Sequence, residues 1–308
     1  SPHQPNVTSY RATAVAIITL ETFAGMWINA FIICVLCIAW VKKKTLNSSE
    51  KILLLLGCSR FWYLCFTWAY YFLSVIYPSY FYDHPILQLI LSFQSFFNHS
   101  SLWVSACLCV FYCVKIANFR NSFFIYLKVK IDRIVPWLLL GSVLSALAIG
   151  IVLYDRIENV QSNNHNFTCL QNFWEANVTM NKQFFSVFFL MGFEYAAPFM
   201  AVIFSAIFLL FSLWRHKCKM QTNSMKNVSM DAHIKAMKSI LSFLVMYSIN
   251  FGCLILAIIY AGRNENTMMF LISMYLCAFP SVHSLILIFS NPKLENTLIR
   301  IISCMKCK

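Results

Sequence analysis

Residues 53–66 read LLLLGCSRFWYLCF, an apolar run that sets one arginine, Arg60, between leucines and aromatic residues. The apolar character extends over residues 52–78, which is long enough to cross a ~30 Å hydrocarbon core as a helix. The chain as a whole is similarly apolar, since its 308 residues are 60% hydrophobic and only 11% charged. Soluble domains are about half apolar and about a quarter charged. We therefore predict a membrane protein that buries a positive charge inside a spanning helix.

Seven apolar runs of about 20 residues or more divide the chain, and each is long enough to span a bilayer. They cover residues 12–41, 52–78, 86–117, 134–154, 184–214, 239–261 and 268–290. Of the connectors, only residues 155–183 form a sizeable loop, and no repeat is visible. We predict an all-α membrane protein, a single seven-transmembrane helix bundle over residues 1–308. A short amphipathic C-terminal helix is expected at 291–304, after the last span.

Basic residues indicate how the bundle is oriented. If the N-terminus lies outside, most of the 24 lysines and arginines fall on the cytoplasmic side, as the positive-inside rule requires. The few that then fall outside are Arg11, Arg156, Lys182 and Arg263. The net charge of +13 is thus mainly a topology signal, and we expect no nucleic-acid partner. The polar start SPHQPNVTSY lacks a basic and then apolar segment, so no cleavable signal peptide is expected.

Sequons and cysteines support the same orientation. The Asn-x-Ser/Thr sequons at Asn6, Asn166 and Asn177 all fall outside and are the expected glycosylation sites. Residues 83–95 contain no cysteine, so no disulfide is expected between the long outer loop and the third span. Cys304 and Cys307 have C-x-x-C spacing but no further ligands nearby, which favours plain thiols or palmitoylation over zinc. We expect no metal and no cofactor.

Arg60 lies nine residues beyond Lys51, roughly 13 Å along the helix and near the middle of the membrane. Snorkelling to water is difficult from that depth, so its guanidinium should find acceptors on neighbouring helices. Two interpretations stay open, a fixed contact between helices and a network that changes partners when helices shift. The polar residues at comparable depth are Asn29 on the first span and Ser281, His283 and Ser284 on the seventh.

Polar residues also gather in the outer halves of the spans. Glu194 lies one turn before Pro198, where a carboxyl group could attract a cationic ligand or sit protonated against a hydroxyl. Residues 94–99 present a polar face on the third span, which either lines a ligand site or bonds to other helices. The side chains that would together line a small-molecule site open to the outside are Tyr71, Gln94, Ser95, Asn98, His99, Glu194, Tyr247, Asn250 and Ser273.

In these strings the chain resembles the bitter taste receptors (taste receptor type 2), a divergent family of G-protein-coupled receptors. The resemblance covers nearly the whole chain. It is carried by LGCSR at 56–60, FYCVKIANF at 111–119, FIYLKVKI at 124–131, LLFSLWRHKCKM at 209–220, DAHIKAMK at 231–238 and PSVHSLILIFSNPKL at 280–294. The rhodopsin-like signatures Asp/Glu-Arg-Tyr in the third span and Cys-Trp-x-Pro in the sixth are missing.

The resemblance implies a multi-pass receptor of the plasma membrane. A small bitter agonist would bind from outside, and a heterotrimeric G protein of the gustducin or inhibitory class would dock at the cytoplasmic ends. The residues expected on that surface are Tyr112, Lys115, His216 and Lys238, although each lysine could equally be ordinary topology charge. The lipid bilayer is a further partner, and a bound sterol is left open. The family often has Trp where this chain has Gln94, so more polar or cationic agonists are expected.

Three other function classes compete with this one. A transporter or channel predicts inverted repeats, broken helices and paired midplane charges. No repeat is visible in this sequence, and its acidic and basic groups within the spans are few. An intramembrane enzyme needs a nucleophile–base pair or a metal motif such as H-E-x-x-H, and the sequence offers neither, so no enzymatic activity is expected. The remaining alternative is another small-molecule chemosensory receptor that acts outside taste tissue.

Overall fold

The structure is a computed structural model that describes residues 4–77, 81, 85–117, 121–163, 182–220, 228–261 and 266–306. Every regular element in these ranges is a helix. The helices are α1 (Gln4–Lys43), α2 (Ser48–Ile76), α4 (Ile86–Ile116), α5 (Ser122–Asn163), α7 (Lys182–Met220), α8 (Val228–Ala261), α9 (Asn266–Ser290) and α10 (Pro292–Lys306).

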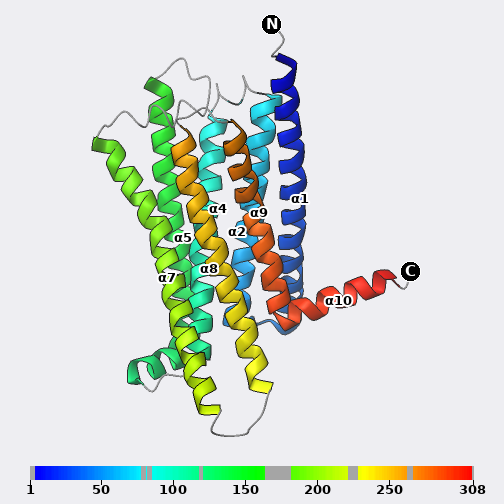
Figure 1. Cartoon of the computed structure of the whole chain (residues 1–308), viewed down its shortest axis with the longest axis vertical. Coiled ribbons are helices and arrows are strands. Elements are labelled where there is room, and N and C mark those ends of the chain that lie inside the picture. Colours follow the sequence, from blue (N-terminus) through cyan, green and yellow to red (C-terminus); the bar gives the residue numbers. More distant parts are fainter. Residues whose placement is uncertain are drawn as a thin grey trace.

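Seven of these helices run side by side as a bundle, and α10 leaves one end of it at a steep angle (Figure 1). Six are long and apolar enough to cross a membrane over their described residues, and α8 contributes the apolar segment Ile240–Cys253. The predicted seven-transmembrane bundle with a short C-terminal helix is confirmed. We call the α10 end of the bundle the inner end and the opposite end the outer end, following the expected orientation.

The helices extend further than the apolar runs from which they were predicted. α1 begins at Gln4 rather than near residue 12, and α5 covers Ser122–Asn163 rather than 134–154. The segment before the fourth span and the first part of the expected loop 155–183 are therefore helical. Hydropathy locates only the membrane-embedded part of a helix, because polar residues outside the bilayer can continue the same hydrogen-bond ladder.

α4 is the central helix, since it packs against α2, α5 and α7 and touches α8. Two apolar clusters meet on it. The first lies toward the inner end, where Leu36, Leu56 and Leu108 pack with Leu294 of α10. The second joins α4 to α7, α8 and α9 around Leu102 and Phe243, among others. These clusters fix the rotation of α4, and so decide which of its polar side chains face the other helices.

α1 approaches the rest of the bundle closely at a glycine. A Cβ atom added to Gly25 would lie 2.0 Å from Ser281 Oγ of α9 and 2.7 Å from Leu64 Cδ1 of α2. No residue larger than glycine fits at this position unless these two groups move. The close approach brings Asn29, one turn further along α1, next to α9.

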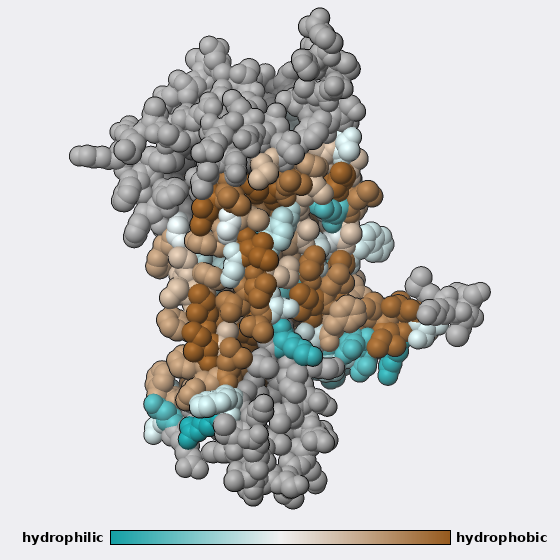
Figure 2. Space-filling view, viewed as in Figure 1, coloured by the Kyte–Doolittle hydropathy of each residue, from teal (hydrophilic) through white to brown (hydrophobic). Residues whose placement is uncertain are grey.

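The outside of the bundle is apolar over its middle, as a lipid-facing surface must be. Figure 2 shows brown side chains along the bundle, with teal residues near the inner end and along the lower side of α10. Large apolar residues are strongly exposed there, among them Trp27 at 76% and Trp137 at 73%. α10 itself carries exposed Ile299, Ile301 and Ile302 together with charged residues.

Candidate functional site

Arg60 is 1% exposed, and its guanidinium donates to three serines on two other helices. Nη1 donates to Ser284 Oγ of α9 at 2.9 Å, Nη2 to Ser105 Oγ of α4 at 3.1 Å, and Nε to Ser101 Oγ of α4 at 3.3 Å. Nη2 also contacts His283 Nδ1. All three guanidinium nitrogens are thus used, and the single nitrogen of a lysine could not reproduce this planar fork of donors.

Arg60, His283, Ser284 and Asn29 are brought together as predicted, although Asn29 enters indirectly. Ser281, the other candidate partner, does not join them, and its buried hydroxyl has no hydrogen-bond partner among the described residues. Ser284 Oγ donates to Asn29 Oδ1 at 2.7 Å, so the serine lies between the arginine and α1. Asn29 Nδ2 itself donates to the Gly25 carbonyl at 2.8 Å. Because a guanidinium can only donate, His283 Nδ1 must be an acceptor, so this imidazole carries its proton on Nε2.

A series of ring contacts runs from this network toward the outer half. His283 stacks on Phe243 of α8 with ring centroids 4.4 Å apart, and Phe243 lies 5.4 Å from Tyr247. Tyr247 stacks in turn on Phe199 of α7 at 5.3 Å. The inner network and the outer half are therefore joined by packed rings on α7, α8 and α9.

One group of predicted ligand-site residues meets between α4, α7 and α8. Asn98 Nδ2 donates to the Tyr195 hydroxyl at 2.9 Å, and the Tyr247 hydroxyl donates to the Tyr195 carbonyl at 3.0 Å. The His99 ring lies 4.9 Å from the Tyr195 ring and is 1% exposed. Its Nδ1 lies 2.8 Å from the carbonyl oxygen of Ser95 and 3.3 Å from the Ser95 hydroxyl. Tyr195, which the sequence did not single out, is the common partner of this group.

Three of the remaining predicted residues lie nearer α2 and α9. Gln94 Nε2 donates to Thr67 Oγ1 of α2 at 3.0 Å, and the side chains of Tyr71 and Ser273 share a hydrogen bond. All three predicted residues are half-buried. Asn250 lies on α8, is 6% exposed and is three residues beyond Tyr247. The predicted site is thus divided into two polar groups, one directed toward α7 and α8 and the other toward α2 and α9.

Glu194 has its own partners within the bundle. Trp103 Nε1 of α4 donates to Oε2 at 2.6 Å, and the Ser145 hydroxyl of α5 lies 2.8 Å from both carboxyl oxygens. The side chain is 7% exposed. Both oxygens are therefore engaged by α4 and α5, and the neighbouring hydroxyl that the sequence allowed for is Ser145.

At the inner end, Lys115 is paired rather than free. Its Nζ lies 2.7 Å from Asp132 Oδ2 of α5, and Asp132 also accepts from the Ser48 side chain of α2. Tyr112 is half-buried against both apolar clusters, and Lys238 is exposed on α8. His216 falls in the α7 helix, but its side chain lies outside the described residues.

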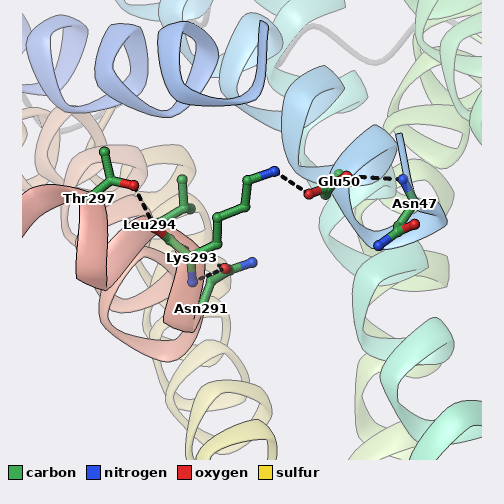
Figure 3. A network of polar contacts seen from close by, with 6 residues as sticks. All are labelled: Asn47, Glu50, Asn291, Lys293, Leu294 and Thr297. Atoms are coloured by element: carbon green, nitrogen blue, oxygen red, sulfur yellow. Dashed lines mark hydrogen bonds and ion pairs between the residues drawn. The ribbon is translucent and has the colours of Figure 1, made fainter. Parts of the chain in front are cut away.

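A second inner contact ties α10 to the start of α2 (Figure 3). Glu50 Oε1 pairs with Lys293 Nζ, while Glu50 Oε2 accepts from the Asn47 backbone N–H at 3.0 Å. Asn291 Oδ1 caps the first turn of α10 by accepting from the N–H of Lys293 at 3.0 Å. One glutamate therefore closes the first turn of α2 and holds the base of α10.

Sequence reasoning missed several partners, chiefly Ser101 and Ser105 for Arg60 and Trp103 and Ser145 for Glu194. The partners of Arg60 could have been predicted from the i, i+4 spacing of Ser101 and Ser105, which puts two hydroxyl groups on one face of the adjacent helix at the level of Arg60. Of the predicted glycosylation sites, Asn6 lies in α1, whereas Asn166 and Asn177 fall outside the described residues. Cys304 is exposed on α10, and Cys307 is likewise outside them.

Comparison with known proteins agrees with the fold and the sequence strings. A family profile described as "Taste receptor protein (TAS2R)" matches residues 7–306. The chain is 30% identical to human Taste receptor type 2 member 2 over 298 residues, 96% of each chain. It is 32% identical to Taste receptor type 2 member 14 of Papio hamadryas over 291 residues, 91% of this chain and 88% of the relative. The chain therefore belongs to the taste receptor type 2 family, the bitter taste receptors among the G-protein-coupled receptors.

Proposed function

We propose that this receptor binds small bitter compounds in the outer half of the bundle, between α4, α7, α8 and α9, and responds by activating a heterotrimeric G protein. The observation that carries the proposal is the convergence of Asn98 and His99 of α4 and Tyr247 of α8 on Tyr195 of α7. Polar groups that meet among aromatic rings are the usual composition of a small-molecule site.

The two polar groups, one toward α7 and α8 and the other toward α2 and α9, would contact different parts of a ligand. The group around Tyr195 adds the rings of Phe199 and Phe251, whose centroids are 5.8 Å apart. The group around Gln94, Tyr71 and Ser273 offers amide and hydroxyl groups near α2 and α9. Asn250 extends the site along α8, and Ser95, one turn nearer the outer end of α4, holds His99 through its backbone carbonyl.

The role proposed for Glu194 differs from the ligand contact that the sequence suggested. Its oxygens are already engaged by Trp103 and Ser145, so a cationic agonist would have to compete with two existing hydrogen bonds. The arrangement favours Glu194 as a contact between α4, α5 and α7 at the edge of the site, rather than as the main counter-charge for the ligand.

Coupling would follow from a shift between two packings of the bundle, one of which the agonist favours. The ring contacts from Phe199 through Tyr247 and Phe243 to His283 offer a physical connection between the ligand site and Arg60. Displacement of Tyr247 would alter the support of His283 and thereby the partners of Arg60.

The G protein, of the gustducin or inhibitory class, would dock at the inner end of the receptor at the plasma membrane. Tyr112, Lys115, His216 and Lys238 are the proposed contacts. If Lys115 takes part, it must exchange its ion pair with Asp132 for one with a group of the G protein. Both side chains are exposed, so breaking the existing ion pair costs little free energy.

The test is agonist-dependent signalling in cells that express the full chain with a matching G protein. A broad panel of bitter compounds should include some that raise intracellular calcium only when both receptor and G protein are present. Surface labelling of the same cells should find the receptor at the plasma membrane. Solute flux that does not require the G protein would contradict the proposal and favour a transporter.

A further inference from the structure

His99 holds a buried hydrogen-bonding atom that the described bundle leaves unused. Its Nδ1 faces the Ser95 carbonyl at 2.8 Å, and its Nε2 is fully buried with no hydrogen-bond partner. Buried polar atoms are nearly always paired, and each exception calls for a cause. On a helix that crosses a membrane, no bulk water is at hand to supply the missing partner.

The Ser95 carbonyl decides what kind of partner is missing. A carbonyl oxygen can only accept, so Nδ1 of His99 carries the ring proton. An ionised ring with one unpaired N–H would be more costly at this depth than a neutral one. The ring is therefore neutral, and its Nε2 offers a lone pair. His283 holds the opposite tautomer, because Arg60 donates to its Nδ1.

The neighbour of the His99 ring that also belongs to the proposed ligand site is Tyr195. The Tyr195 ring lies 4.9 Å from the His99 ring, tilted by 55°, and the two rings share no hydrogen bond. Tyr195 is itself half-buried and is held by Asn98 through its hydroxyl and by Tyr247 through its carbonyl. Because Nε2 is fully buried, a ligand can reach it only if a neighbouring side chain moves, and Tyr195 is the neighbour that belongs to the proposed site.

We infer that His99 Nε2 is the acceptor that selects agonists of this receptor, namely aromatic compounds, neutral or cationic, that present an N–H or O–H group to it. This inference rests on the proposed function, since it names the ligand chemistry of that same site. A compound without a donor leaves Nε2 unpaired and forfeits one buried hydrogen bond. Compounds that would place an anionic group against Nε2 are disfavoured, because the lone pairs of that group and of Nε2 repel each other.

The test uses pairs of bitter compounds that differ by methylation of one donor, with theophylline and caffeine as the N–H pair and hydroxyflavones with their O-methyl ethers as the O–H pairs. In the full-length receptor, the agonists found in the panel should carry a free N–H or O–H. Methylation of that group should raise the half-maximal concentration about tenfold, as expected for one buried hydrogen bond.

Three variants of His99 distinguish the effect of the Nε2 acceptor from the effect of the size of the ring. His99→Gln places an amide oxygen near the Nε2 position and should keep most of the methylation effect. His99→Asn places its amide near Nδ1 and should lose the effect, as should His99→Phe. If His99→Phe fails to reach the cell surface, the comparison of Gln with Asn and the wild-type compound pairs still decide the matter.

Two results would overturn the inference while leaving the receptor function intact. One is a set of agonists that are as potent without a donor as with one. The other is a methylation effect of equal size in wild type and in His99→Asn, which would place the donor's partner elsewhere or show that a buried water already satisfies Nε2. A receptor that is present at the surface and answers no compound at all would instead refute the proposed function, and this inference with it.

Discussion

Arg60 Nη1 donates to Ser284 Oγ at 2.9 Å, and that same hydroxyl donates onward to Asn29, so one serine connects α2, α9 and α1. The hydroxyl serves as acceptor and donor at once, which fixes its orientation. The three helices are thereby held at one level of the bundle by a single oxygen atom.

Replacing Arg60 tests how much of the fold depends on this network. Arg60→Ala should cost about 3 kcal/mol or more, because it removes a large buried side chain and its hydrogen bonds together. Surface expression, measured by antibody labelling of intact cells, should fall several-fold. Arg60→Lys should retain part of it, since an ammonium keeps the charge but cannot make the fork. Normal signalling by Arg60→Ala would refute the role of the network.

Ser284→Ala tests the link between α9 and α1 while leaving the charge of Arg60 in place. The substitution removes one acceptor of Arg60 and the only side chain that donates to Asn29 Oδ1 among the described residues. We expect a loss of about 1–3 kcal/mol in unfolding free energy, visible as a lower melting temperature of the purified receptor. Ser303→Ala on α10, an exposed serine, is the matched control and should leave the melting temperature unchanged.

Glu194 can be tested by a pair of substitutions. Glu194→Gln keeps a carbonyl oxygen for the Trp103 N–H, so surface expression should stay near wild type. Glu194→Ala leaves that buried N–H without an acceptor and should cost about 1–3 kcal/mol. The double variant Trp103→Phe with Glu194→Ala should recover part of that loss, because it removes the unpaired donor. A tenfold loss of potency in Glu194→Gln, confined to cationic agonists, would instead restore Glu194 as the ligand counter-charge.

Tyr247→Phe removes the hydroxyl that holds the Tyr195 carbonyl while keeping the rings stacked on Phe199 and Phe243. One hydrogen bond of about 1 kcal/mol corresponds to a change in equilibrium of roughly fivefold. If that bond restrains Tyr195, agonist potency should rise by about this factor in calcium dose–response curves. A fall in potency would show that the hydroxyl contacts the agonist directly.

The contact between Glu50 and Lys293 is suited to a double-mutant cycle. Glu50→Gln keeps an acceptor for the Asn47 N–H, and Lys293→Met keeps the length of the side chain. Because Lys293 is about one third exposed, the coupling between the two changes should be no more than about 1 kcal/mol. Melting temperatures of the two single variants and the double variant give this coupling, and strictly additive effects would show that the pair contributes nothing.

The sequence was sufficient to predict the bundle, because seven apolar runs can be satisfied only by spanning helices. It was also sufficient to predict that Arg60 meets α9 and is linked through Ser284 to α1, since depth alone restricts the acceptors available to a buried charge. The serines of α4 that complete the network were missed, because the rotation of α4 about its axis is set by packing at Leu102 and Leu108 rather than by polarity.

Glu194 shows the same limitation. Its distance from Pro198 gives its depth, but not which neighbouring helix it faces. Trp103 and Ser145 lie 91 and 49 residues away along the chain, and neither is unusual in a membrane helix. Only the relative placement of α4, α5 and α7 could reveal that the three side chains converge.

The partners of Arg60 have an electrical consequence. Among the described residues they are serine hydroxyls and an imidazole nitrogen, none of them a carboxylate, so the charge is solvated without being neutralised. A full charge crossing the membrane is worth about 2.3 kcal/mol per 100 mV. A shift of α2 that carried Arg60 through a tenth of the field would thus change the energy by roughly 0.2 kcal/mol per 100 mV. Any such displacement on activation gives the receptor a small intrinsic sensitivity to the voltage of the cell that carries it.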